Sequence, residues 1–209
     1  MTGPRSTEYL VGLVRELVKS PDETEWIEFK ENNADPIEIG EYISALSNSA
    51  ALLGKTAGYC LWGIENATHR IVGTTFRPET ARKGSEPLEN WVLHLLEPKI
   101  DFRFHDIPID GVRVVLLEIA RAIRHPVRFS GQEFIRVGSQ KKKLKDFPEK
   151  ERDLWRVFDQ HAFEDGVAAE RVTNEQALAL LDYPAYFELL KIPLPETREA
   201  ILAALKDDE

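Results

Sequence analysis

The chain has 209 residues, of which 43% are hydrophobic and 30% are charged, and its formal net charge is −9. This composition is ordinary for a globular protein, and the length is sufficient to bury a core without disulfides or metals. It excludes a membrane-spanning helix, because no apolar run approaches the ~20 residues that such a helix needs, and the acidic balance argues against a general polyanion binder.

The first half of the chain predicts two helices and three strands. Apolar residues at helical spacing follow Thr7, which can cap a helix that Pro21 ends. Asp35-Pro36 introduces the second helix. The strands are expected at about residues 26–30, 58–64 and 71–73.

The middle of the chain predicts two β-hairpins, each built on a turn-forming pair of residues. The pairs are Asp110-Gly111 and Ser130-Gly131. The strands that they join are expected at 102–107 with 112–119, and at 127–129 with 133–137. A helix at about 86–96 precedes both hairpins.

Beyond Pro148 the composition becomes helical and acidic. Thr173 with Gln176 forms a capping box for one helix, and Pro195 opens a last one. Helices interleaved with hairpins predict an α+β fold with a mixed, mostly antiparallel sheet packed by helices. We expect a domain at residues 1–150 and a helical extension at 151–209. The sequence stops at residues 207–209 directly after a predicted helix, which fits either the start of a truncated second region or a natural end.

Charge is distributed unevenly along the chain. Residues 1–112 hold 11 Lys and Arg against 18 Asp and Glu, and residues 151–209 hold 6 against 14. Between them, residues 113–150 hold 10 Lys and Arg against 4 Asp and Glu. One basic band therefore lies between two acidic flanks, and any phosphate-binding surface is expected in this band.

Cysteine content and the N-terminus indicate the compartment. The single cysteine, Cys60, excludes an intrachain disulfide and fits a reducing environment. The residues up to Leu10 have no apolar stretch long enough for a signal peptide. We therefore expect a cytoplasmic protein without membrane partners.

Four segments, in their order and spacing, resemble the Schlafen-type AlbA-like domain of bacterial regulators and Schlafen proteins. The segments are Glu23-x4-Glu28-Phe29-Lys30, Ile43-Ser-Ala-Leu-Ser-Asn48, residues 58–65 with 71–73, and Phe134-Ile-Arg-Val-Gly-Ser139. The resemblance covers about residues 8–145 and implies a nucleic-acid-associated module. One departure is that the family's Gly-Gly pair before the central strand is replaced by the longer stretch Ala50–Gly58, which ends in Gly58.

Three carboxylates and one lysine form the first candidate site. The resemblance implies that Glu23, Glu28 and Glu65 hold a divalent cation, Mg2+ or Mn2+, in a nuclease. Strand alternation separately places Glu28 and Lys30 on one face, where a carboxylate can hold a cation and a lysine can meet phosphate or the attacking water. Alternatively, Glu28 and Lys30 are solvated residues on the exposed face of a half-buried sheet, paired for little energy.

The second candidate site is basic and suits phosphate contacts that position nucleic acid without reading its sequence. Its residues are Arg124, Arg128, Arg136, Lys141, Lys142, Lys143 and Lys145, with Arg121 and His125 beside them. Backbone amides freed at Gly138 suit the same contacts. Trp62, Phe129 and Phe134 can stack on single-stranded bases, although core packing is their commoner use. The alternative for the basic residues is a solvated charged loop.

These observations leave three functions open. The favoured one is a nucleic-acid-binding module of a bacterial transcriptional regulator, which binds RNA or DNA and requires no cofactor. The second is a divalent-metal-dependent ribonuclease or nuclease of the Schlafen type. The third is a protein-interaction platform whose acidic ends contact a partner or another copy of the chain, as in a homo-oligomer.

Overall fold

A four-stranded sheet organises the first part of the chain in the computed structural model, which describes residues 5–20, 24–161 and 172–206. The strand order is β1 (Ile27–Lys30), β2 (Ala57–Trp62), β7 (Val112–Ala120) and β6 (Phe102–Ile109). β1 and β2 run parallel, whereas β2 with β7 and β7 with β6 are antiparallel. All six residues of β2 are buried, so the strand is recognisable in the sequence as an unbroken apolar run.

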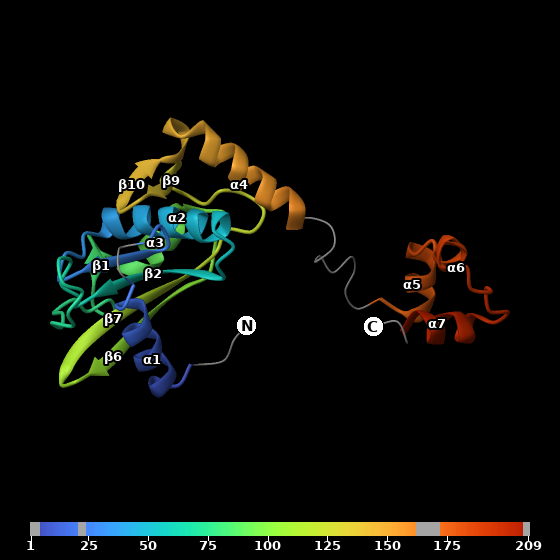
Figure 1. Cartoon of the computed structure of the whole chain (residues 1–209), viewed down its shortest axis with the longest axis horizontal. Coiled ribbons are helices and arrows are strands. Elements are labelled where there is room, and N and C mark those ends of the chain that lie inside the picture. The colour runs from blue at the N-terminus through green and yellow to red at the C-terminus, as the bar shows by residue number, and fades with distance from the viewer. Residues whose placement is uncertain (1–4, 21–23, 162–171, 207–209) are drawn as a thin grey trace. The chain divides into compact units, whose positions relative to one another are not determined.

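Helices cover both faces of this sheet (Figure 1). On one face, α1 (Thr7–Leu17) packs its buried residues against those of the strands: Leu10, Val14 and Leu17 against Ile27, Phe29, Tyr59 and Leu61. On the other face, α2 (Pro36–Leu52) packs Ile39, Ile43 and Leu46 against Cys60 and Trp62. Because side chains alternate along a strand, Glu28 and Lys30 point to the α2 face.

A second sheet lies across α2 from the first (Figure 1). Its order is β10 (Gln140–Lys143), β9 (Gln132–Val137), β8 (Arg128–Phe129) and β5 (Leu96–Glu97), with antiparallel neighbours. α2 therefore has strands on two sides, which accounts for its many buried residues. The residue pairs at both hairpin turns have positive φ, as expected for tight hairpins.

Buried polar side chains of α2 bind the backbone of the second sheet. Ser44 Oγ donates to the carbonyl of Val127 (2.7 Å) and accepts from the amide of Phe134 (3.0 Å). Asn48 accepts from the amide of Val127 through Oδ1 (2.7 Å) and donates to the carbonyls of Val127 (2.8 Å) and Phe134 (2.9 Å) through Nδ2. The polar residues of the segment 43–48 thus satisfy backbone groups that would otherwise be buried without partners.

Gly58 of β2 lies close against the backbone of α2. A Cβ atom added at this position would lie 2.8 Å from the carbonyl oxygen of Leu46. A side chain at residue 58 would therefore push β2 away from α2.

The remaining elements of the first part connect and cover these layers. They are β3 (Arg82–Lys83), β4 (Glu86–Pro87), α3 (Leu88–Leu95), the 3-10 turn η1 (Leu144–Asp146) and α4 (Pro148–His161). Leu154 and Phe158 of α4 join the core that α2 builds. The expected division after residue 150 falls inside α4, and the compact first unit runs from Met1 to Glu164.

The second unit, Asp165–Glu209, holds α5 (Asn174–Leu180), α6 (Tyr183–Leu190) and α7 (Arg198–Lys206). Leu178, Phe187 and Ile201 form its small core. The capping box of Thr173 and Gln176 is confirmed, since the side chain of each residue accepts from the other's backbone amide.

The α+β fold class is confirmed, and the differences from the sequence prediction are local. Residues 71–73 form no strand, and Ile71 makes an isolated bridge to Ile64. The helix predicted from residue 86 begins at Leu88, because Glu86 and Pro87 pair with β3. Ser6, rather than Thr7, caps α1. Within the described residues, no helix is long and apolar enough to cross a membrane.

Candidate functional site

Glu28 of β1 is buried, with 3% of its surface exposed. One carboxylate oxygen lies 2.7 Å from Lys30 Nζ on the same strand, and the other accepts from Arg136 of β9. Arg136 has no exposed surface. The two sheets are therefore tied by an ion pair beside α2. Removing a carboxylate from water is costly unless cations and hydrogen bonds compensate, as they do here.

Tyr42 of α2 completes this cluster, which we call the buried charge network (Glu28, Lys30, Tyr42 and Arg136). Lys30 Nζ donates to the Tyr42 hydroxyl at 3.0 Å. Lys30 and Arg136 also lie over the Tyr42 ring, at 4.8 and 5.8 Å from its centroid. A ring face attracts cations in this position.

The buried charge network raises the pKa of two of its members, Tyr42 and Lys30. Burial raises the pKa of the Tyr42 hydroxyl to about 12, and the nearby Glu28 charge acts in the same direction. Burial by itself lowers the pKa of Lys30, but the hydrogen bonds with Glu28 and Tyr42 outweigh it and raise this pKa above its ordinary value. Lys30 is therefore a fixed cation, and Tyr42 stays neutral as its acceptor.

The other predicted carboxylates are placed differently. Glu65 follows β2, is partly exposed, and pairs with Arg70 at 3.1 Å. Hydrogen bonds from Thr68 and Arg70 lower the pKa of its carboxyl. Glu23 lies outside the described residues. No group of three His, Cys, Asp or Glu residues within 5–20, 24–161 and 172–206 could hold a metal ion, and the three-carboxylate site with Glu23 stays a prediction.

The predicted basic site divides into paired and unpaired cations. Arg136 lies in the buried charge network, which corrects the expectation that it joins a phosphate-binding surface; its strand face is covered by α2. Lys141 pairs with Glu41 at 2.5 Å and lies 4.3 Å from the Tyr42 ring centroid. Arg128 is only loosely paired, at 3.6 Å from Glu97 and 4.0 Å from Glu133.

Five cations of this region have no carboxylate partner among the described residues, and we call them the free cations. Arg124, Lys142, Lys143 and Lys145 are exposed, and Arg121 is half-buried. Lys142 and Lys143 belong to β10, an edge strand, and Lys145 to the turn that follows it. These cations are positioned by backbone structure and remain available to an external anion.

The Gly138 turn does not present its amide to a ligand. Its N–H donates to Glu25 Oε1 at 3.0 Å, and Lys150 holds both oxygens of the same carboxylate at 2.9 Å. This corrects the expectation of phosphate-binding amides at Gly138, because Glu25 already occupies the donor. Trp62, Phe129 and Phe134 are buried, which agrees with core packing rather than stacking on bases.

Sequence reasoning missed Tyr42 and Glu25 as members of these sites. Tyr42 has the position of an ordinary apolar-face residue of α2. Its partners come from three strands, β1, β9 and β10. Glu25 is one of many glutamates in an acidic segment. No local pattern marks either residue, because the contacts join positions more than ten residues apart.

Comparison with protein-family models decides the family. The model described as Schlafen, AlbA_2 matches residues 23–145, which is more than half of the chain. The chain belongs to the Schlafen AlbA_2 family. The match spans β1 to η1 and so includes the buried charge network and the free cations, which places both in a nucleic-acid-related domain.

Two solved structures are similar at low identity. The N-terminal domain of an ATP-dependent DNA helicase RecG-related protein from Nitrosomonas europaea is 20% identical, with a TM-score of 0.42 over 66% of this chain and 93% of that one. The DIP2311 protein from Corynebacterium diphtheriae is 19% identical, with a TM-score of 0.40 over 65% of this chain and 30% of that one. The chain thus spans about a third of DIP2311. None of the curated proteins compared with it matches.

Proposed function

We propose that this Schlafen AlbA_2 chain is a nucleic-acid-binding module of a bacterial transcriptional regulator, and that the free cations hold the phosphate backbone. The observation that carries the proposal is their lack of carboxylate partners. In a chain with a net charge of −9, these five cations of the basic band are not neutralised by carboxylates of the described residues and are available to an anion from outside. Nucleic acid backbones supply such anions at regular spacing.

The electrostatics of the module suit contacts that position a backbone and do not read bases. Three of the five free cations are lysines on an edge strand and in a turn, which are flexible point charges without the fixed fork of arginine that pairs with a guanine edge. We therefore expect salt-dependent binding with little sequence preference. The metal-free form is the one that binds, because the free cations neutralise phosphate directly.

The test is binding of labelled tRNA and single-stranded DNA over a salt series, with EDTA or with Mn2+. We expect a salt-sensitive complex that EDTA leaves unchanged, and weaker binding by the variant Lys142→Ala/Lys143→Ala/Lys145→Ala. The slope of log K against log salt is negative, and losing three phosphate contacts reduces its magnitude by about 2–3.

A matched control removes the same charge elsewhere. Arg15, Lys19 and Arg77 are exposed cations outside the basic region, and their triple replacement by alanine leaves the binding nearly unchanged. Equal weakening by both triple variants would mean that net charge, and not the free cations, governs binding. Absence of binding at low salt would refute the module and favour the protein-interaction platform.

A divalent-metal-dependent nuclease is the second candidate, favoured by the contact between Glu28 and Lys30 on β1. In this role Glu23, Glu28 and Glu65 hold Mg2+ or Mn2+, and Lys30 assists at the phosphate. Such an enzyme has to release Glu28 from two cations before a metal can bind. The test is Mn2+-dependent cleavage that EDTA abolishes. If the unaltered chain cleaves and a folded Glu28→Gln variant does not, the function is cleavage and not binding alone.

A further inference from the structure

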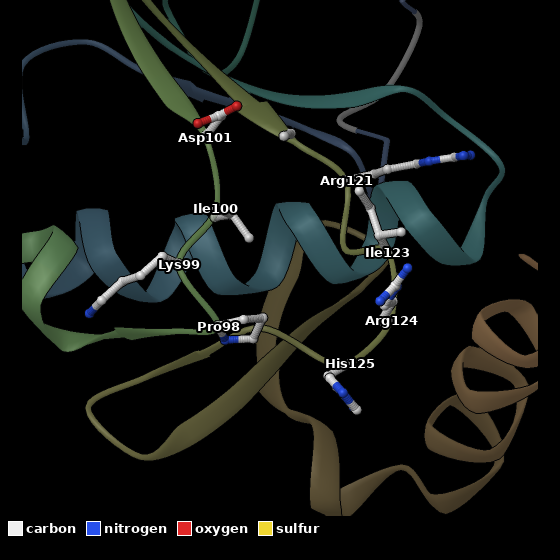
Figure 2. Close-up of a pocket in the computed structure, with 9 residues that line it drawn as sticks. Pro98, Lys99, Ile100, Asp101, Arg121, Ile123, Arg124 and His125 are labelled. Atoms are coloured by element: carbon white, nitrogen blue, oxygen red, sulfur yellow. The ribbon is translucent and has the colours of Figure 1, made fainter. Parts of the chain in front are cut away.

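A pocket of about 400 Å3 lies between two connecting segments of the first unit (Figure 2). One wall is the link from β5 to β6, residues 98–101, and the other is the link from β7 to β8, residues 121–125. The volume falls in the range of roughly 300–1,000 Å3 that small-ligand sites occupy. Two of the free cations, Arg121 and Arg124, line it, and the binding described above uses none of its other lining residues.

Hydrogen bonds hold both walls in place. The amide of Ala120 donates to the carbonyl of Asp101 at 2.9 Å and joins the walls at one end, and the amide of Ala122 donates to the carbonyl of Ser47 of α2 at 3.1 Å. Lys99 Nζ donates to the carbonyls of Leu93, His94 and Leu96. Its amine therefore closes the end of α3 and points away from the pocket (Figure 2).

The interior surface of the pocket is mainly apolar, and apolar side chains offer no hydrogen-bond donors to a polar ligand. Pro98 and Ile100 on one wall and Ile123 on the other contribute hydrocarbon surface. Ile123 is 59% exposed, so much of its hydrocarbon surface is accessible to a ligand in the pocket. Trp155 of α4 is also exposed, and its ring lies 5.8 Å from that of His125 at the rim. Exposed apolar groups gathered in a concave site indicate an apolar ligand group.

Charge divides the pocket into two ends. Asp101 lies at one end and repels phosphate there, while the Arg121 side chain near that end extends away; Arg124 lies at the other end (Figure 2). Arg124 has no carboxylate partner among the described residues. A ligand with an apolar ring and an anionic group on one side matches this arrangement, and a nucleotide unit of a single strand has this form.

We infer that the pocket takes one unpaired nucleobase of a single-stranded nucleic acid, with Arg124 on the adjacent phosphate. This inference rests on the proposed function and sharpens it: the module prefers unpaired strands to duplexes, whose bases are stacked and cannot enter. Faces of bases stack on apolar and aromatic side chains with little regard to sequence. Asp101 can accept from amino or imino groups at the edge of the base.

The test separates bases from backbone. Fluorescence anisotropy compares a labelled thymidine oligomer of about 12 nucleotides, a length within the range that OB-fold single-strand binders cover, with an abasic oligomer of the same length made with tetrahydrofuran residues. One stacked base contributes about 5- to 150-fold in affinity. We expect the thymidine oligomer to bind more tightly by a factor in this range, and Ile123→Ser to reduce that advantage while leaving abasic binding unchanged.

Ile37→Ser is the matched control, since Ile37 is a similarly exposed isoleucine that does not line the pocket. It should change neither affinity. Two results would overturn the inference that the pocket takes a base: equal binding of both oligomers by the unaltered chain, or equal weakening of both by Ile123→Ser. Either result would leave the proposed backbone binding intact. Failure to bind either oligomer at low salt would instead refute the proposed function itself.

Discussion

The buried charge network and the free cations contain the same kinds of residue in opposite environments. Glu28, Lys30 and Arg136 are held in the interior by one another, with Tyr42 as an additional acceptor. Lys142, Lys143 and Lys145 stand on an edge strand and a turn, without carboxylate partners in the described chain. Each region is charged, but the interior charges are committed to one another, whereas the surface charges remain available.

The difference shows that burial and pairing, rather than residue type, decide what a charge does. Lys141 and Lys142 are neighbours in the sequence and still fall on the two sides of this division, because side chains alternate across the strand. Lys141 turns to Glu41 and Tyr42, and Lys142 does not. The two regions therefore predict opposite responses to mutation.

The largest expected effect is on stability, from separating the buried ion pair. Glu28→Ala or Arg136→Met leaves a buried charge with too few partners and lowers the free energy of unfolding by about 3–5 kcal/mol. Urea denaturation followed by circular dichroism measures this loss. The double variant Glu28→Ala/Arg136→Met should lose less than the sum of the two single variants, and simple additivity would show that the network is not a unit.

Alkaline pH should weaken the same network. The pKa of Tyr42 is near 12 in the folded protein and near the ordinary 10 in the unfolded chain. Between these values the folded state binds more protons, so the free energy of unfolding falls as pH rises from 10 to 12. Since Tyr42 is only half-buried, the fall is about 1–2 kcal/mol.

Tyr42→Phe isolates this contribution. The stability difference between the unaltered chain and the variant should narrow from pH 10 to 12, as measured by urea denaturation at each pH. A constant difference would mean that the Tyr42 hydroxyl does not titrate as the network requires. Tyr42→Phe also removes one of the hydrogen bonds that raise the pKa of Lys30, and this change narrows the difference in the same direction.

The free cations should respond in the reverse manner. Lys142→Ala/Lys143→Ala/Lys145→Ala is expected to change the free energy of unfolding by less than about 0.5 kcal/mol, because no partner is lost. The triple variant is expected instead to weaken nucleic acid binding and to reduce its salt dependence. A large loss of stability would show that these lysines support the fold, and thermal denaturation of the triple variant reports it directly.

Arg128 lies between the two cases, and its expected effects on stability and on binding are both small. It is partly exposed and its ion pairs are long, at 3.6 and 4.0 Å. Arg128→Ala should change the free energy of unfolding by about 0–1 kcal/mol and weaken nucleic acid binding slightly. An effect comparable with that of Arg136→Met would remove the distinction between the two regions.

Local sequence signals were sufficient for the elements that depend on near neighbours. Asp110-Gly111 and Ser130-Gly131 specified both hairpins, and Thr173 with Gln176 specified the cap of α5. The apolar run of β2 was visible because the strand is buried on both faces. β10 was missed, because its three lysines have no apolar alternation and form a strand only by pairing with β9.

What the sequence determined by itself was the fold class, the family motifs and the existence of a basic band. Tertiary structure decided which of the charges are available. Arg136 and Lys142 come from the same basic band, but α2 and β1 cover Arg136 and bring Glu28 to it across more than a hundred residues. The cost of burying an unpaired charge then fixes its partner, and that cost depends on the assembled layers and not on any local pattern.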